Sequence, residues 1–218
     1  MKKIFTLIAA VAFAAKASAQ VLTFTEFAKG AQPANVSNEG LVLTITDTDG
    51  KLSCDANTAY FGTADSYTSF TTRLKTGGKS SSKNGLTLTL PADGTLKVYA
   101  RTGSNGATDR NIVLTQNDKE LVNKILLESE AVEVTIGEDA KKVYPIVETA
   151  ATKGDVVITY PVNSINIYAI ELVLGNSTGI SKVYTYSASD NTFNLAGVKV
   201  ADTTKGLVIK GGKKYIKK

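Results

Sequence analysis

The feature that most constrains this 218-residue chain is a run of strict apolar alternation in residues 84–116. Three leucines occupy every second position of residues 86–90, and the same spacing returns in residues 96–100 after an Asp-Gly pair at 93–94. A period of two is typical of half-buried β-strands, and glycine accepts the positive φ of a tight turn. The stretch therefore predicts three antiparallel strands with one face toward a core and the other toward solvent or a ligand.

Short strands of this kind are predicted along most of the chain. They lie at residues 21–27, 41–45, 70–75, 132–136, 143–147, 155–160 and 164–174. The last is apolar on both faces, which predicts a central strand that is covered on both sides. Residues 120–128 suit a helix or a strand, and the flanking strands favour the strand. Regular strands with turn signals predict an all-β fold, a jelly-roll-type antiparallel β-sandwich with a small β-rich C-terminal tail.

The first 19 residues have the pattern of a signal peptide. Two lysines precede an apolar run at residues 4–15, and Ala-Ser-Ala at residues 17–19 fits a cleavage site, so Gln20 would begin the mature chain. No later stretch is long and apolar enough to predict a transmembrane segment. We expect a bacterial protein that is secreted or held at the cell surface.

The net charge of +5 is unevenly distributed along the chain. Without the signal peptide, 22 basic residues face 20 acidic ones, and residues 179–218 hold eight of these lysines against two aspartates. The rest of the mature chain is net acidic, which makes nucleic acid a poor ligand for it. The predicted division is a sandwich at 20–175, a linker at 176–181 and a tail at 182–218.

The chain contains no histidine, and Cys54 is its single cysteine. These absences exclude an intrachain disulfide, a histidine-dependent nucleophile and a histidine-ligated zinc site. Glycosidase chemistry would need two carboxylates across a cleft. Glu128, Glu130 and Glu133 are available, but clustered charges near a strand start more often face solvent. We therefore expect a protein that is not an enzyme.

Five side chains are candidates for ligand binding. Arg73, Lys75, Tyr99 and Arg101 fall on the non-core phase of their strands, and Arg110 follows a Gly-rich loop. An aromatic ring can stack on a sugar, and guanidinium groups pair bidentately with carboxylates. An acidic polysaccharide would suit both. The alternative is a solvated strand face, with Arg110 paired to a nearby carboxylate such as Asp109.

A structural calcium ion is the one cofactor that the sequence suggests. Glu26, on the first strand, and Glu171, on the last strand of the sandwich, would meet at a sheet edge and supply oxygen ligands. The segment at residues 47–50 begins like a calcium loop. Thr58 stands where such a loop needs its glutamate, so a plain turn is predicted there.

Four segments carry a resemblance to a known module. Residues 70–78, 94–101, 107–110 and 165–171 are similar, in this order, to a β-sandwich module that precedes pectate-lyase-like domains in secreted Bacteroidetes proteins. The resemblance implies a carbohydrate-binding-like jelly roll without lyase activity. Pectin is the acidic plant polysaccharide that this context suggests. The competing hypothesis is a structural or adhesive surface protein with a protein partner, which an exposed flat apolar patch would favour.

The tail carries a second resemblance. Its segments at residues 194–200, 205–209 and 212–218 resemble the short C-terminal sorting domains of secreted Bacteroidetes proteins. The resemblance implies that the type IX secretion machinery recognises the tail, often with its removal and attachment of the protein to the cell surface.

Overall fold

The computed structural model describes residues 19–175, 192–193, 199–201, 205–210 and 213–217. The chain divides into two compact units, Met1–Asn176 and Ser177–Lys218. Within the described residues every regular element is a strand except one short 3-10 turn, η1 (Glu128–Glu130). The predicted signal peptide up to residue 18 and the linker at 176–181 lie outside the described residues.

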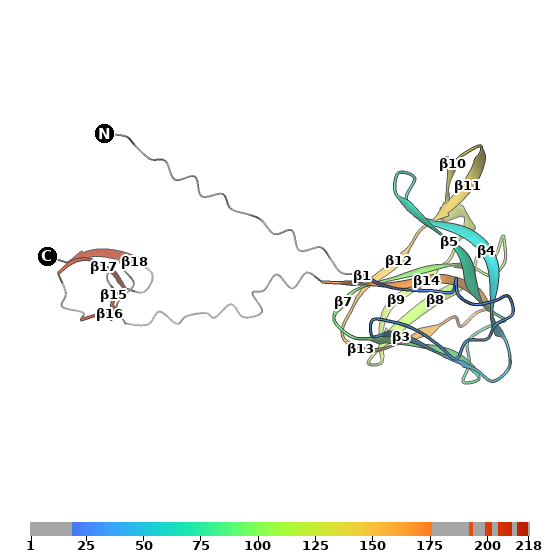
Figure 1. The fold of residues 1–218 in the computed structure, drawn as a ribbon, viewed down its shortest axis with the longest axis horizontal. Helices are drawn as coiled ribbons and strands as arrows, with labels where there is room; N and C mark the ends of the chain where they lie inside the picture. Colours follow the sequence, from blue (N-terminus) through green and yellow to red (C-terminus); the bar gives the residue numbers. More distant parts are fainter. Residues whose placement is uncertain (1–18, 176–191, 194–198, 202–204, 211–212, 218) are drawn as a thin grey trace. The chain divides into compact units, whose positions relative to one another are not determined.

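The first unit is a sandwich of two sheets (Figure 1). The eight-stranded sheet has the order β10-β11-β4-β5-β14-β7-β12, with β1 also paired to β14. Its strands are β1 (Ala19–Thr23), β4 (Leu52–Gly62), β5 (Tyr67–Thr76), β7 (Gly94–Thr102), β10 (Val132–Ile136), β11 (Asp139–Tyr144), β12 (Val147–Ala151) and β14 (Ile165–Leu174). All the pairs are antiparallel except β11 with β4.

The six-stranded sheet has the order β2-β3-β6-β13-β8-β9 and is antiparallel throughout. Its strands are β2 (Asn35–Asn38), β3 (Leu41–Asp47), β6 (Asn84–Leu90), β8 (Asn111–Gln116), β9 (Lys119–Ile125) and β13 (Gly154–Thr159). The predicted all-β antiparallel sandwich is therefore confirmed. The ambiguous segment at residues 120–128 lies mostly in β9, so the choice of a strand is confirmed as well.

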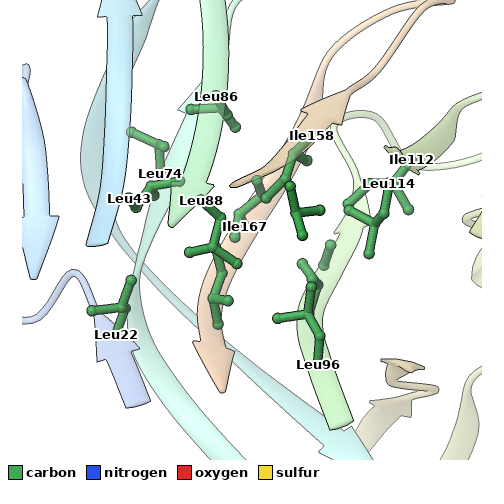
Figure 2. Packing of buried hydrophobic residues seen from close by; sticks show 14 of the residues in the cluster. Leu22, Leu43, Leu74, Leu86, Leu88, Leu96, Ile112, Leu114, Ile158 and Ile167 are labelled. Carbon is green, nitrogen blue, oxygen red and sulfur yellow. The ribbon is translucent and has the colours of Figure 1, made fainter. Parts of the chain in front are cut away.

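The main core lies between the two sheets and is built from the alternating positions of the sequence. Leu86 and Leu88 of β6 project from one sheet, and Leu96 of β7 projects from the other (Figure 2). All three are buried. Burial of a leucine side chain contributes about 1.5–3 kcal/mol, so alternation over this many strands specifies both the register and the inner face of each strand.

β14 is the central strand of the larger sheet. β7 pairs along one side of it, and β1 pairs along the other from Ala169 to Val173. A bulge at Tyr168 interrupts the β7 ladder. Its residues up to Ile170 are buried, because both faces of the strand are covered. The prediction of a central strand covered on both sides is thus confirmed.

β5 leaves the larger sheet early, and this departure creates an arm. It pairs with β14 only at Asn166–Lys75 and Ile167–Leu74, after which β1 takes its place. The rest of the β4–β5 hairpin, residues 56–70, continues with β11 at its side. We call residues 56–70 together with β10 and β11 the arm; these strands rise from one end of the sandwich in Figure 1.

The described residues of the second unit form four short strands in the order β16-β15-β17-β18. They are β15 (Thr192–Phe193), β16 (Lys199–Val200), β17 (Gly206–Lys210) and β18 (Lys213–Lys217). β17 and β18 form an antiparallel pair, and residues 211–212 between them lie outside the described residues. The β-rich character expected of the tail is therefore present in its described part.

Candidate functional site

An aromatic cluster lies on the face of the larger sheet that points away from the main core. Its rings are those of Phe61, Phe70, Tyr99, Tyr144 and Tyr168. Phe61 is at the centre, with centroid distances of 5.2 Å to Tyr168, 5.7 Å to Tyr99 and 5.9 Å to Tyr144. The arm supplies Phe61, Phe70 and Tyr144, while β7 and β14 supply Tyr99 and Tyr168. The arm therefore covers a face that alternation alone assigned to solvent.

Tyr99 is not the exposed platform that the sequence predicted. Its exposed fraction is 5%, and its ring packs at 4.9 Å from that of Phe70. The Tyr99 hydroxyl donates a hydrogen bond to Glu171 Oε2. Burial, together with this carboxylate, raises the pKa of Tyr99 above its ordinary value. Stacking of a sugar on Tyr99 would require the arm to move away.

Arg73 and Lys75 lie at the base of the arm and share one carboxylate. Arg73 Nε and Nη2 donate to the two oxygens of Asp55 at 2.6 and 3.2 Å, and Lys75 Nζ lies 3.7 Å from Asp55 Oδ2. Burial opposes ionisation of Asp55, but the hydrogen bond and charge of Arg73, with those of Lys75, outweigh it and lower its pKa. The bidentate pair fixes the guanidinium, whereas the Lys75 side chain remains 47% exposed.

Arg101 lies between the arm and the segment that follows β9. Its Nη2 donates to Glu128 Oε1 at 3.0 Å, and its guanidinium carbon lies 4.7 Å from the centre of the Tyr144 ring. The Tyr144 hydroxyl donates to Glu128 Oε2 at 2.9 Å, and Lys142 Nζ is 3.6 Å from the same oxygen. The pocket lined by Arg101, Glu128 and Tyr144 has about 10 Å³ open to a water-sized sphere, room for about one water molecule. The Arg101 guanidinium is thus held by protein groups, with no room beside it for a sugar.

Four cations lie on one side of the cluster, and two carboxylates, those of Glu171 and Glu148, lie near Tyr99. Among the described residues the four cations, Arg73, Lys75, Arg101 and Lys142, pair with the carboxylates of Asp55 and Glu128. We call these four cations the cationic rim. Lys75 and Lys142 are its open members, since the Lys142 side chain is 49% exposed. The structure brings three of the five predicted ligand residues onto this rim, and Tyr99 lies beneath it.

Arg110 is separate from the cationic rim. Its Nη1 donates to the backbone carbonyl and to the hydroxyl of Ser164, at 3.0 and 2.7 Å. The neighbouring Gly103 N–H donates to the same carbonyl. Arg110 therefore fastens the Gly-rich loop to the start of β14, through Ser164 and not through the carboxylate considered from the sequence.

Neither of the two glutamates suggested for calcium lies where the sequence predicted it. Glu26 lies in the turn beyond the end of β1, so its placement on the first strand was wrong. Glu171 lies within the central strand β14 opposite Val21, and not at a sheet edge. It accepts the Tyr99 hydrogen bond. Among the described residues, no group of three or more acidic or cysteine side chains could hold a metal ion.

Other carboxylates singled out from the sequence have structural partners here. Asp47 accepts hydrogen bonds from the backbone N–H groups of Lys51 and Leu52, both at 2.8 Å, as a plain turn requires. Glu130 accepts from Lys124 Nζ at 2.7 Å, and Glu128 is held by Arg101 and Tyr144.

Sequence reasoning missed Lys142, Asp55 and most of the aromatic cluster. The positions of Phe61, Tyr144 and Tyr168 could have predicted the cluster. Large aromatic residues at the polar positions of a strand indicate that the second face of the sheet is also buried. The arm also presents apolar side chains on its other face. Tyr67 is 41% exposed and its ring meets that of Tyr60 at 6.1 Å, edge to face.

No protein-family model matches the sequence, and no curated protein matches it. A solved chain from the study "The complexity of the Ruminococcus flavefaciens cellulosome reflects an expansion in glycan recognition" is similar in structure, with a TM-score of 0.38 and 14% identity. The match covers 72% of this chain and 95% of that chain. A likeness at this level carries no conclusion about function. No helix among the described residues is long and apolar enough to cross a membrane.

Proposed function

We propose that this protein is an exported, non-catalytic carbohydrate-binding module whose ligand is an acidic polysaccharide such as pectin. The observation that carries the proposal is the cationic rim, in which four cations share two carboxylates. The excess positive charge is exposed at Lys75 and Lys142. A polymer of uronic acids carries carboxylates at regular intervals and so complements this charge.

The arginines and the lysines of the cationic rim have different roles. Asp55 and Glu128 hold Arg73 and Arg101 in place by short, partly buried hydrogen bonds. Lys75 and Lys142 lie at 3.6–3.7 Å from the same carboxylates and keep much of their side chains in water. A flexible ammonium group at the surface can turn toward a ligand carboxylate with little loss of internal bonding. The lysines are therefore the ligand contacts, and the arginines position the carboxylates beneath them.

Affinity electrophoresis in gels that contain polygalacturonate tests this function. We expect the wild type to be retarded and the double variant Lys75→Ala/Lys142→Ala to be retarded much less. Exposed ion pairs contribute about 0.2–1 kcal/mol each, so the loss of two contacts weakens binding roughly two- to thirtyfold. Lys119→Ala, at an exposed position of β9, is the matched control and should bind as the wild type does.

Salt provides a second readout, because exposed charge pairs are screened within about 8–10 Å at ordinary ionic strength. Retardation should weaken as salt is added. If acidic polysaccharides do not retard the wild type at low salt, the proposal is wrong. If the double variant binds as tightly as the wild type, the ligand contacts a different face.

We also propose that the tail directs export, as its resemblance to sorting domains implies. Deletion of residues 179–218 should leave a folded sandwich that reaches the wrong location in the cell. The division of the chain into two compact units supports this separation. An unfolded truncated protein would contradict it.

The second candidate function, a surface protein with a protein partner, is favoured by one observation. Tyr67 on the arm and Val132 of β10 are both more than 40% exposed, and exposed apolar patches mark interaction sites.

A further inference from the structure

β10 forms one edge of the eight-stranded sheet, and no other described strand pairs with its outer side. Its sequence, Val-Glu-Val-Thr-Ile, places Val132, Val134 and Ile136 on one face. Val132 is 43% exposed. An edge strand leaves a row of backbone groups unpaired, and proteins commonly block such edges with lysine or proline. β10 contains neither residue.

The other edge strands of the two sheets differ from β10. β9 carries Lys119, Glu120 and Lys124, and β2 is four residues long and mostly polar. β12, at the far edge of the larger sheet, buries its valine. Compared with β2, β9 and β12, β10 therefore combines a row of β-branched apolar side chains with an edge that carries no lysine or proline, its one charged residue being Glu133.

The hairpin that joins β10 to β11 shows which backbone groups are free. The turn has two residues, Gly137 and Glu138, and Gly137 has a φ of +67°. A two-residue turn closes on a hydrogen-bonded pair, here Ile136 and Asp139. Because pairs alternate along an antiparallel ladder, the backbone groups of Glu133 and Thr135 point away from β11. These groups are the donors and acceptors of the free edge.

We propose that this edge binds β10 of a second copy of the chain, antiparallel, about a two-fold axis at Val134. In this register Val134 faces its own counterpart, and Val132 faces the partner's Ile136. Glu133 and the partner's Thr135 exchange backbone hydrogen bonds. The two glutamates are not opposite each other, so like charges do not meet. The strand is thus complementary to itself in both side chains and hydrogen bonds.

The same face continues from β10 onto β11. Val132 pairs with Val143, which is fully buried, and Val134 pairs with Lys141, whose ammonium is bound to Asp139. Pairing of two arms therefore joins the apolar side chains of β10 around the axis, with a Lys141–Asp139 ion pair on each side. A two-fold interface closes on itself, so it produces a dimer and not a fibre.

A cysteine at the axis tests the register directly. Directly opposite Cβ atoms lie about 4.5–5.5 Å apart, close enough for a disulfide after small shifts. Val134→Cys in the full chain should form a covalent dimer under mild oxidation. Native Cys54 does not compete, because it is buried and burial raises its pKa to about 11. Val157→Cys, at a valine 44% exposed on β13, is the matched control and should stay monomeric. Equal yields of covalent dimer from the two variants would overturn the register.

Light scattering across a range of protein concentrations tests the dimer without cross-linking. The wild type should be dimeric, and Val134→Lys should be monomeric because it sets two ammonium groups together at the axis. Thr135→Lys sets an ammonium opposite the partner's Glu133 and should leave the dimer intact, as should Val157→Lys. A wild type that is monomeric at every concentration overturns the proposal, and so does a dimeric Val134→Lys variant.

Discussion

The main core and the aromatic cluster are buried on opposite faces of the same two strands, β7 and β14. On the core face, Leu96 and Val98 pack among side chains that are aliphatic with few exceptions. On the other face the side chains are mostly aromatic, and the hydroxyl groups of Tyr99, Tyr144 and Tyr168 each donate a hydrogen bond to a polar side chain. The first layer is closed by a second sheet. The second layer is closed by a hairpin that leaves its sheet and folds over it.

The two layers should differ in how their contribution to stability depends on pH. Aliphatic packing depends on area and shape alone, so it is insensitive to pH. A buried hydroxyl costs free energy unless it has a hydrogen-bond partner. In the aromatic cluster the partners of Tyr99 and Tyr144 are carboxylates, so this layer depends on ionised groups. The comparison predicts that substitutions act on both layers, whereas pH acts mainly on the cluster.

The largest expected effect comes from the main core. Leu88→Ala removes a fully buried side chain at the centre of β6. The lost burial and the cavity together should lower the free energy of unfolding by about 2–5 kcal/mol. Urea unfolding, followed by far-ultraviolet circular dichroism, measures the change. A loss below about 1 kcal/mol would show that the two sheets are not packed as described.

The second-largest expected effect is a loss of stability at alkaline pH, chiefly through the tyrosines of the aromatic cluster. Burial raises the pKa of Tyr99, Tyr144 and Tyr168, and it raises the pKa of Tyr160 in the main core to about 12. The folded protein therefore keeps these protons after the unfolded chain has lost them near pH 10. Their stabilising effect is complete below pH 10 and declines above it.

The decline should reach up to about 1.4 kcal/mol per pH unit for each such tyrosine. Urea unfolding between pH 9 and pH 11 measures the slope, and tyrosinate absorbance monitors ionisation. The variant Tyr99→Phe should show a shallower slope. A flat profile would mean that the cluster is open to solvent.

A smaller effect is expected from a single hydroxyl, with one tyrosine of each layer for comparison. The Tyr168 hydroxyl donates to Asn57 Oδ1 in the cluster, whereas that of Tyr160 lies 3.5 Å from the Asn84 carbonyl, at the limit of a hydrogen bond. Tyr168→Phe should lower the free energy of unfolding by about 1–1.5 kcal/mol, and Tyr160→Phe by about 0.5 kcal/mol or less. Thermal unfolding of both variants checks the order, and a reversed order would contradict the difference between the layers.

The smallest expected effect is a loss of stability at low pH through Asp55, which lies where the arm begins. Arg73 and Lys75 lower the pKa of Asp55, so its contribution is present above about pH 3.8 and is lost as pH falls through the lower folded value. Asp55→Asn should reduce stability by about 1 kcal/mol or less at neutral pH, since such pairs are partly screened. The gap between variant and wild type should close in acid, below pH 3.8. A gap that persists there would assign the loss to packing.

Alternation in the sequence predicted the main core well, because its physical cause is local. Leu86 and Leu88, two residues apart on β6, must share a face whatever the rest of the chain does. Alternation could not show that β6 and β7, which follow one another in the sequence, lie in different sheets. The fate of Tyr99 could not be predicted in this way, because alternation assigns a side chain to a face and does not say whether the face is covered. The cover comes from Phe61 and Phe70, and it depends on where β5 leaves β14, a non-local event.

The candidate site could be predicted only in part for the same reason, since its contacts are also non-local. Arg73, Lys75 and Arg101 were correctly assigned to the non-core face, but their partners Asp55 and Glu128 come from distant segments. Sequence alone could not show that both arginines are held by carboxylates while Lys75 remains open. The separation of Arg110 from the rim follows from its bonds to Ser164, which is 54 residues away along the chain.

The last strand of the sandwich is also its central strand, and this arrangement governs how the domain withstands pulling. Gly175 follows directly on β14, which is bonded to β7 on one side and to β1 on the other. Tension applied through the following segment would enter the sheet in the middle. Extraction of β14 must break two ladders at once, whereas an edge strand would peel away from one. We therefore expect β14 to resist extraction by tension more strongly than an edge strand would.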